Sequence, residues 1–361
     1  MKALTIVGAR PQFIKAAAVS AAIDHHNERG HEPIVEVMVH TGQHYDAQMS
    51  DVFFDQLSIR PVSHRLDVGS SSHGAQTGRM LEAIESVLMN ERPDVVIVYG
   101  DTNSTLAGAL AAAKLAVPIA HVEAGLRSFV PSMPEEINRV LTDHVSSLLF
   151  CPTVHSVALL EAEGICDGVE LVGDVMLDVF MATMKRLSEA NPVAQSLEVS
   201  RPYALVTLHR AANTDDEHRF AAIVAGLNEV AANGMPLIWP VHPRIAQRLG
   251  AVNLHPDIHL TEPAGYQELL ALLRDAEVVL TDSGGLQKEA YWATTPCLTL
   301  RDETEWIETV DTGWNRLVAA DCSAIARSIT DVERPTTHPA LFGNADASSL
   351  IVEHLVTRFR G

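Results

Sequence analysis

Three acidic side chains stand where predicted strands end and where a helix begins. Glu123 follows the apolar stretch "PIAHV", Asp101 follows "VVIVYG", and Glu135 lies at the start of the next helical segment. A buried carboxylate is costly unless it is paired. Carboxylates that face one another can transfer protons and stabilise positive charge, so we interpret these three residues as a candidate catalytic group.

The stretch "SMPEEINRVLTDH" also has a structural explanation. Ser132 and Glu135 fit a capping box with Pro134 in the first helical turn, and Arg139 is then an ion-pair partner on the helix surface. The apolar residues of this region are expected to form a buried stripe, and they are Ile137, Val140, Leu141 and Leu148. This explanation leaves Glu123 unaccounted for.

A glycine turn near the N-terminus carries two cations. Gly8 allows a sharp turn after the first predicted strand, and Arg10 and Lys15 follow at the beginning of a helix. Free backbone amides at a helix N-terminus attract anions, and positive side chains strengthen that attraction. The turn is therefore a candidate phosphate site.

A second glycine turn lies in "TDSGGLQKEA". Ser283 and Gly284 open a helix with bare backbone amides that can approach a pyrophosphate, and Glu289 lies further along, where it can accept hydrogen bonds from ribose hydroxyls. The alternative is that the glycines only turn the chain tightly. Neither GxGxxG nor GxxxxGK[ST] occurs, so no nicotinamide or Walker-type site is indicated and no cofactor is predicted.

Two of the seventeen histidines stand out by their position. His209 and His242 each end a predicted strand in the second half of the chain. His40 and His44 have the spacing H-x3-H, but they lie in the loop-like stretch "HTGQH" without a third ligand or a helix to hold them. No metal site is predicted.

The elements that must position these residues are alternating strands and helices. Apolar runs such as "DVVIVYG" alternate with helical segments such as "STLAGALAAAKL", which indicates parallel sheets covered on both faces and an α/β fold. The pattern restarts, so we predict Rossmann-like domains over 1–174 and 175–345 and a C-terminal helix over 346–361. Six polar motifs directly follow strands, where parallel sheets bind ligands, so we expect the two domains to face each other across a cleft.

The composition excludes several kinds of partner. The chain holds 26 Lys and Arg against 46 Asp and Glu, and its net charge of −20 repels nucleic acid and anionic membranes. Its apolar runs are too short for a secretory signal or a membrane span. The four cysteines lack disulfide-like spacing, so we expect a cytoplasmic protein with reduced thiols.

Eight motifs together resemble one known family. The stretches "GARPQFIK", "HTGQHYD", "GDTNSTLAGALAA", "HVEAGLRS", "PEEINR", "LHR", "VHP" and "TDSGGLQKEA" are similar, in order and spacing, to those of the non-hydrolysing UDP-N-acetylglucosamine 2-epimerases. The resemblance covers nearly the whole chain. It implies a glycosyltransferase-B type fold, a UDP-sugar substrate and a homodimer.

The resemblance also implies a role for each candidate residue. Members of this family remove UDP from the sugar and add it back through a glycal, which acidifies and inverts carbon 2 without a redox cofactor. The acid/base and cation-stabilising residues are then Asp101, Glu123 and Glu135, assisted by His209. The residues implied to bind the substrate are Arg10, Lys15, Gln43, Arg139, His242, Ser283, Gly284 and Glu289.

Three stretches depart from the pattern of this family. They are "GARPQ" for "GTRPE", "HRAAN" for "HRREN" and "RDETEWIE" for "RDTTERPE", and the residues that change the charge are Gln12, Ala211, Ala212 and Trp306. Fewer acidic residues suit a substrate with an extra carboxylate, as in the sub-branch that acts on UDP-2,3-diacetamido-2,3-dideoxy-glucuronate. The lost second arginine of "HRREN" argues the other way, so both substrates stay open.

Other functions fit the same motifs. A glycosyltransferase of the same fold also uses a UDP-sugar and strand-end carboxylates, but it needs an acceptor. A non-catalytic sensor binds the UDP-sugar without exchange at carbon 2. A hydrolysing epimerase releases free UDP together with the sugar.

Overall fold

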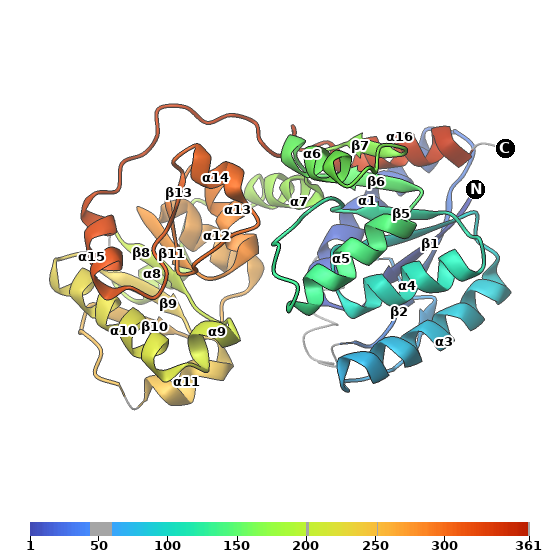
Figure 1. Cartoon of the computed structure of the whole chain (residues 1–361). Coiled ribbons are helices and arrows are strands. Elements are labelled where there is room, and N and C mark those ends of the chain that lie inside the picture. Colours follow the sequence, from blue (N-terminus) through green and yellow to red (C-terminus); the bar gives the residue numbers. More distant parts are fainter. Residues whose placement is uncertain (44–59, 200–201, 251, 360–361) are drawn as a thin grey trace. The chain divides into compact units, whose positions relative to one another are not determined.

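The computed structural model of the chain describes residues 1–43, 60–199, 202–250 and 252–359 (Figure 1). His44 and the predicted helical stretch "MSDVFFDQL" lie outside these ranges. The chain divides into two compact units, of which unit 1 comprises Met1–Met181 and Ala340–Gly361 and unit 2 comprises Ala182–Pro339. No helix within the described ranges is both long and apolar enough to cross a membrane.

Unit 1 is built on one parallel sheet. Its strands are β1 (Lys2–Val7), β2 (Val35–His40), β3 (His64–Arg65), β4 (Val95–Tyr99), β5 (Ile119–Val122), β6 (Leu148–Cys151) and β7 (Val169–Leu171). Their order is β3-β2-β1-β4-β5-β6-β7, and all neighbouring pairs are parallel. Strands β4, β5 and β6 are buried along their whole length, as expected for a sheet with both faces covered.

Helices cover both faces of this sheet (Figure 1). They are α1 (Arg10–Glu28), α3 (His73–Glu91), α4 (Asn103–Lys114), α5 (Pro134–Val145), α6 (Val154–Ala162) and α16 (Ala347–Phe359). Helix α7 (Val175–Met184) follows β7 and continues past the division between the units. Successive strand residues point to opposite faces, so Val7 packs in a core with Ile23 of α1, whereas Ile6 packs in another core with Ile84 of α3. The sheet is therefore held rigidly between two apolar layers.

Unit 2 repeats the same architecture. Its strands are β8 (Ala204–Thr207), β9 (Leu237–Pro240), β10 (Ile258–Thr261), β11 (Val278–Thr281), β12 (Cys297–Thr299) and β13 (Asn315–Leu317). The order is β10-β9-β8-β11-β12-β13, again all parallel. The helices are α8 (Pro192–Ser196), α9 (Ala211–Thr214), α10 (Glu217–Ala232), α11 (Pro243–Leu249), α12 (Tyr266–Asp275), α13 (Gly284–Trp292), α14 (Ile307–Asp311) and α15 (Cys322–Thr330). The predicted α/β class with two Rossmann-like halves is confirmed.

The compact units and the predicted domains have different bounds. The sequence predicts a division at residue 175, whereas the units divide after Met181, within α7. The predicted C-terminal helix over 346–361 corresponds to α16, whose Ile351 and Leu355 join the core of unit 1. This apolar face explains why the chain returns to unit 1 at Ala340.

Candidate active site

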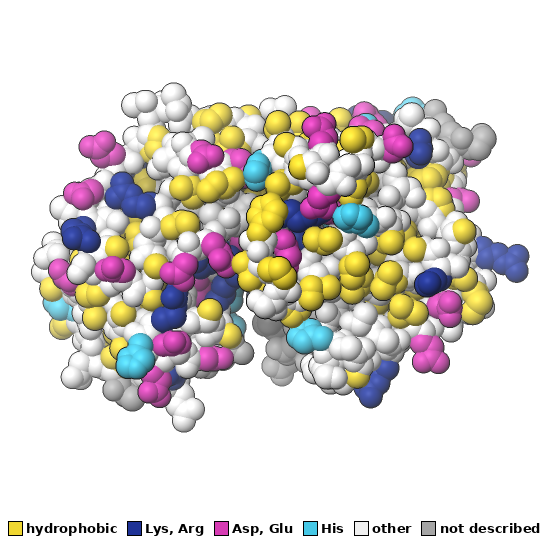
Figure 2. All heavy atoms as spheres, in the orientation of Figure 1, with side chains coloured by type: hydrophobic (Ala, Val, Ile, Leu, Met, Phe, Trp, Pro, Cys, Tyr) yellow, Lys and Arg dark blue, Asp and Glu magenta, His cyan; other side chains and the backbone are white. Residues whose placement is uncertain are grey.

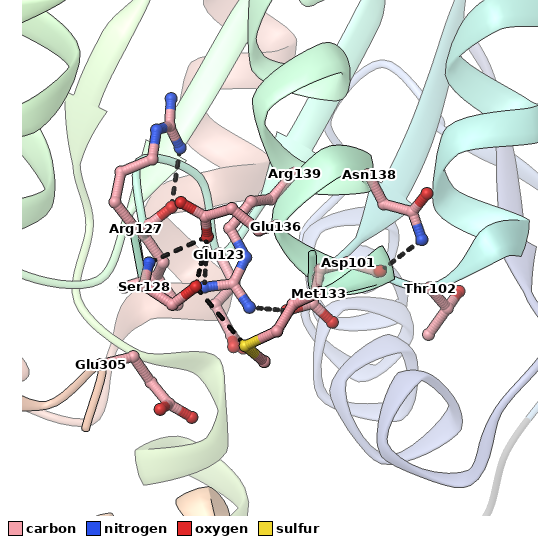
Figure 3. Close-up of polar contacts among 12 residues, drawn as sticks. Asp101, Thr102, Glu123, Arg127, Ser128, Met133, Glu136, Asn138, Arg139 and Glu305 are labelled. Carbon is pink, nitrogen blue, oxygen red and sulfur yellow. Dashed lines mark hydrogen bonds and ion pairs between the residues drawn. The ribbon is translucent and has the colours of Figure 1, made fainter. Parts of the chain in front are cut away.

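Asp101 and Arg139 form an ion pair beyond the carboxyl end of β4. Arg139 Nη2 lies 2.5 Å from Asp101 Oδ2, and the side-chain amide of Asn138 donates to the backbone carbonyl of Asp101 at 2.9 Å (Figure 3). Burial raises the pKa of Asp101, and Arg139 opposes this only in part. The negative charges of Glu123 and Glu135 raise it further. Asp101 therefore keeps a proton to higher pH than an ordinary aspartate, which suits proton transfer.

Lys15 and Glu123 form a second ion pair, beyond the end of β5. Lys15 Nζ reaches Glu123 Oε2, and the two side chains are only 9% and 14% exposed. The backbone of Glu123 is left-handed, with φ of 70°, which is uncommon for a residue other than glycine. Such a conformation costs about 1–3 kcal/mol and persists where the surrounding structure holds it, often at functional sites. The carboxylate is thus held in place by its backbone and by a buried cation.

Glu136, and not Glu135, has the structural role at the start of α5. No side chain caps this helix. The Glu136 carboxylate instead accepts hydrogen bonds from the backbone N–H groups of Ser128 at 2.8 Å and Phe129 at 2.9 Å, and from the Ser128 hydroxyl at 2.9 Å (Figure 3). The capping-box explanation for Ser132 and Glu135 is therefore wrong. Glu135 is exposed, and capping does not account for it.

The apolar stripe expected to be buried on α5 faces outward. Ile137 is 49% exposed and Leu141 is 44% exposed, and Leu148 lies in β6 rather than in the helix. The side chains that α5 buries are polar, and they are Glu136, Asn138, Arg139, Thr142 and Asp143. The prediction of a buried Ile137/Leu141 stripe is wrong because the charged and amide groups of this polar face find partners inside unit 1.

A buried charge network supplies several of those partners. Asp143 Oδ1 lies 2.7 Å from His121 Nδ1, while Oδ2 accepts from Arg127 Nη1 at 2.7 Å and from the backbone N–H of Gly125 at 3.2 Å. His121 Nε2 donates to the carbonyl of Gly100 at 2.8 Å. Burial disfavours the charged form of Asp143, but His121 and Arg127 outweigh it and lower its pKa. The network ties α5 to the turns that follow β4 and β5.

The turn between β1 and α1 is held by an amide. A Cβ atom on Gly8 would lie 2.1 Å from Ser104 Oγ, so only glycine fits there. Gln12 Oε1 accepts from the Gly8 N–H at 2.8 Å, and its NH2 group donates to the end of β4 and to α4. Gln12 is 1% exposed, so this departure from the family pattern serves the fold and does not change the surface charge. Arg10 is exposed at the first turn of α1.

Gln43 is also engaged within unit 1. Its Oε1 accepts hydrogen bonds from the backbone N–H of Ser104 at 3.0 Å and from the Ser104 hydroxyl at 2.6 Å. Its backbone carbonyl accepts from the Gln76 side chain at 3.3 Å. Gln43 thus joins the loop after β2 to the start of α4, and it is a buried residue rather than a surface amide.

His209 and His242 come together beyond β8 and β9 in unit 2. Their ring centroids are 6.1 Å apart. The His209 side chain is 42% exposed, and its Nδ1 lies 3.1 Å from Oδ1 of Asp282, whose side chain is fully buried. Asp282 directly follows β11, so three neighbouring strands of unit 2 end in this group.

The second glycine turn forms the start of α13. Ser283 Oγ accepts a hydrogen bond from the Leu286 N–H at 3.3 Å and caps the helix. A Cβ atom on Gly284 would lie 2.5 Å from Oε1 of Glu305, so a larger residue here would have to displace the end of that side chain. Glu289 is buried further along the same helix. Ser283, Gly284 and Glu289 thus share one helix, as the motif predicted.

The departure at Trp306 changes packing. Trp306 is 3% exposed, and Lys288 Nζ lies 4.0 Å from the centre of its ring, which is a cation–π contact. Ala211 and Ala212 lie exposed at the beginning of α9. Of the four charge-changing positions, only these two alanines lie at the surface.

The sequence motifs do not single out two residues that hold strand-end groups in place, Asp282 in unit 2 and Asp143 in unit 1. Asp282 carries the same signal as Asp101, an acid directly beyond a strand, and that signal was available in "VVLTDSGG". Asp143 lies within a helix, where an acid is ordinarily solvated, so no local pattern singles it out. Within the described ranges, no group of three or more His, Cys, Asp or Glu side chains is arranged to hold a metal ion.

The fold and these strand-end groups are those of a glycosyltransferase-B type protein, and comparisons define the family. The sequence model of the UDP-N-acetylglucosamine 2-epimerase family matches residues 27–356. The UDP-2,3-diacetamido-2,3-dideoxy-D-glucuronate 2-epimerase of Pseudomonas aeruginosa is 48% identical over 98% of this chain and 99% of its own length. The UDP-N-acetylglucosamine 2-epimerase of Methanocaldococcus jannaschii is 42% identical, over 98% and 99%.

A solved structure agrees with these relatives. The crystal structure of the M. jannaschii UDP-GlcNAc 2-epimerase in complex with UDP-GlcNAc and UDP superposes with a TM-score of 0.88, at 41% identity, and covers 99% of this chain and 100% of that chain. This chain therefore belongs to the UDP-N-acetylglucosamine 2-epimerase family, whose named members are isomerases.

Proposed function

We propose that this chain is a non-hydrolysing 2-epimerase of a UDP-linked 2-acetamido sugar, which supplies a precursor of surface polysaccharide. The observation that carries the proposal is the pairing of acids with cations at one edge of the unit 1 sheet, Asp101 with Arg139 and Glu123 with Lys15. The family and its named relatives support the same reaction.

The chemistry explains why acids are needed. The hydrogen on carbon 2 of the sugar is not beside a carbonyl, so it is too weakly acidic for direct removal. When the bond from carbon 1 to UDP breaks, carbon 1 develops positive charge and the neighbouring hydrogen becomes acidic. Removal of that proton gives a glycal, and return of UDP with a proton on the opposite face inverts carbon 2. Atoms and electrons balance without an oxidant.

We assign these steps to the acids of unit 1. The acid, the base and the group that stabilises the cationic sugar are Asp101, Glu123 and Glu135. Which of them donates and which removes the proton depends on the face of carbon 2 that each one approaches. The raised pKa of Asp101 suits a group that exchanges protons. His209 assists the departing diphosphate.

The remaining candidate residues are proposed to bind the substrate. Cations and helix amides hold the diphosphate, Glu289 holds the ribose, and Gln43 contributes near the sugar; the diphosphate group comprises Arg10, Lys15, Arg139, His242, Ser283 and Gly284. Two sugars are proposed, because the relatives named above include a UDP-N-acetylglucosamine 2-epimerase and a UDP-2,3-diacetamido-2,3-dideoxy-D-glucuronate 2-epimerase.

Incubation without an acceptor tests this function. The protein is offered each UDP-sugar alone, and the products are followed by proton NMR. Formation of the 2-epimer without free UDP supports the proposal. No reaction with either sugar, despite binding in calorimetry, identifies a sensor, and turnover only with an added acceptor identifies a glycosyltransferase. Stoichiometric free UDP and sugar identify a hydrolysing enzyme.

A homodimer through α5 is part of the proposal. Figure 2 shows hydrophobic side chains on the face of unit 1 over α4 and α5, where Ile137 and Leu141 are exposed. A second copy fits this face because Ile137 and Leu141 lie one helical turn apart, so the same two apolar side chains of a two-fold related copy can cover them. The cysteines of the described residues are free thiols, which supports a cytoplasmic location.

Light scattering after size exclusion tests the dimer. Ile137→Glu with Leu141→Glu is expected to give a folded monomer, since like charges would then face each other. Val154→Glu, at a residue that is 69% exposed on α6, is the control and is expected to leave the mass unchanged. A monomeric wild-type protein, or a double variant of unchanged mass, contradicts the proposed contact.

A further inference from the structure

Asp282 lies at the centre of a buried hydrogen-bond group in unit 2. Its carboxylate is fully buried where β11 ends. It accepts from the backbone N–H of His209 at 3.1 Å and of Arg210 at 2.9 Å, and from the side-chain amide of Asn213 at 3.2 Å. These donors all belong to the turn after β8 and to α9, so one carboxylate fixes the whole turn.

The same carboxylate orients an imidazole. Oδ1 of Asp282 lies 3.1 Å from Nδ1 of His209. Backbone and side-chain donors, together with the charge of His209, outweigh burial and lower the pKa of Asp282. The ionised carboxylate can only accept, so Nδ1 of His209 carries the proton. Because Nε2 lies on the opposite edge of the ring, it faces away from the carboxylate, and the His209 side chain is 42% exposed.

The fold brings these two residues together by register. Strands β8 and β11 are parallel neighbours in which Thr207 pairs with Thr281, and the two threonine hydroxyls lie 2.6 Å apart. His209 and Asp282 follow directly beyond this pair. Two buried strands therefore bring the two positions together, and Asp282 itself holds the turn in which His209 lies.

We propose that Asp282 is a positioning residue for His209, which it holds with Nδ1 protonated so that Nε2 meets the departing diphosphate. This inference rests on the proposed function. When the bond from carbon 1 breaks, its electron pair passes to the diphosphate oxygen. This step requires a proton on both ring nitrogens of His209, so that Nε2–H donates a hydrogen bond to that oxygen. When UDP returns, the same oxygen gives the electron pair back to carbon 1 and the hydrogen bond is released. The carboxylate neither gains nor loses a proton in this cycle.

Asp282→Asn tests the proposal because it keeps the size of the side chain and removes acceptors. An amide has one acceptor oxygen and a donating NH2 group, so it cannot satisfy donors from His209, Arg210 and Asn213 together. Loss of an orienting carboxylate from a comparable Asp–His pair lowers kcat by about 10⁴. We expect kcat to fall by about 10²–10⁴, with a smaller change in KM.

A double-mutant cycle separates positioning from a general structural role. If Asp282 acts through His209, adding Asp282→Asn to His209→Gln costs little more than His209→Gln alone. If the double variant instead loses the product of the two single factors, the proposal is overturned. Asp321→Asn is the matched control, since Asp321 also accepts a backbone N–H, from Ala324 at 2.8 Å, and is expected to leave kcat unchanged.

A spectroscopic measurement on the wild-type protein tests the inference independently of activity. In ¹⁵N-histidine NMR, the His209 ring is assigned by its disappearance in His209→Gln. A protonated Nδ1 supports the proposal, and a bare Nδ1 overturns it. If the wild-type protein epimerises neither UDP-sugar, the proposed function fails, while the NMR result still decides whether Asp282 sets the state of the ring.

Discussion

Two features of Glu123 each cost folding free energy. Its backbone is left-handed, and its carboxylate is largely withdrawn from water beside Lys15. The ion pair offsets part of the cost of burial, but a well-packed apolar pair would be as stable without the strain. A site that retains both the strained backbone and the buried ion pair is one in which the carboxylate has a functional role.

We expect Glu123→Gln to lower kcat by about 10²–10⁴, as loss of a group that transfers protons does. The Kd for UDP should change little, because the amide preserves the shape and UDP does not need this carboxylate. Steady-state kinetics and calorimetry measure the two quantities. Glu82→Gln, at an exposed position on α3, is the control. Near-full activity of Glu123→Gln would remove this residue from the mechanism.

Some of the site residues are predictable from the local sequence, and others are not. The acids that follow strands, Asp101 and Glu123, are predictable because a charge directly beyond a buried strand has few structural explanations. The burial of Gln12 is not predictable from its local sequence, since it depends on contacts with the end of β4 and with α4, far away in the sequence. Local patterns therefore find the acids but not the polar residues that hold them.

At the scale of elements, α5 departs most from its pattern. Its apolar residues have helical spacing, which ordinarily predicts the buried face. The structure buries the opposite face because Asp143 and Arg139 meet charges on neighbouring strands and turns. Periodicity identifies the apolar face of a helix. It does not show whether that face or the polar face is buried when the polar face has partners inside the protein. The strands are easier, since their burial is nearly continuous.

The network around Asp143 gives a pH-dependent contribution to stability. The pKa of Asp143 is lowered in the folded state, so its contribution is complete above its ordinary pKa of 3.8 and is lost as the pH falls through the lowered value. We expect Asp143→Asn to reduce the free energy of unfolding by about 3–5 kcal/mol at neutral pH, because His121 and Arg127 lose their buried partner.

Urea unfolding of the wild type and of Asp143→Asn, from neutral pH down to about pH 3, measures this difference. The gap between the two proteins should shrink on the acid side. Asp321→Asn, in which only a helix-capping carboxylate changes, serves as the control. A gap that is independent of pH would show that Asp143 is not ionised in the folded protein.

The whole molecule consists of two parallel-sheet units whose number and class are predictable from the alternation of apolar and helical segments. The position of the division between the units is not predictable from the sequence. The helical pattern of α7 continues unchanged across the division after Met181, and α16 joins unit 1 only through tertiary contacts. The net charge of −20 remains compatible with an anionic ligand, since basic groups such as Arg10 and Arg210 are placed at helix starts.

If unit 2 holds the nucleotide, UDP should stabilise the whole protein. A ligand at 100 times its Kd adds about 2.7 kcal/mol to the free energy of unfolding, so the Tm should rise with UDP concentration. His242→Ala should reduce the rise in Tm that UDP causes. It should leave the Tm of the free protein nearly unchanged, because His242 is exposed. Differential scanning fluorimetry follows both. An undiminished shift in His242→Ala would exclude this residue from the nucleotide site.

The most direct measurement is the exchange of the hydrogen on carbon 2 with solvent. The protein is incubated in deuterated water with UDP-N-acetylglucosamine and, separately, with UDP-2,3-diacetamido-2,3-dideoxy-glucuronate, and proton NMR follows the carbon 2 signal. We expect this signal to disappear for one of the sugars as the epimer forms with deuterium at carbon 2. An epimer that keeps its original hydrogen, or no loss of signal with either sugar, would contradict the proposed elimination and re-addition of UDP.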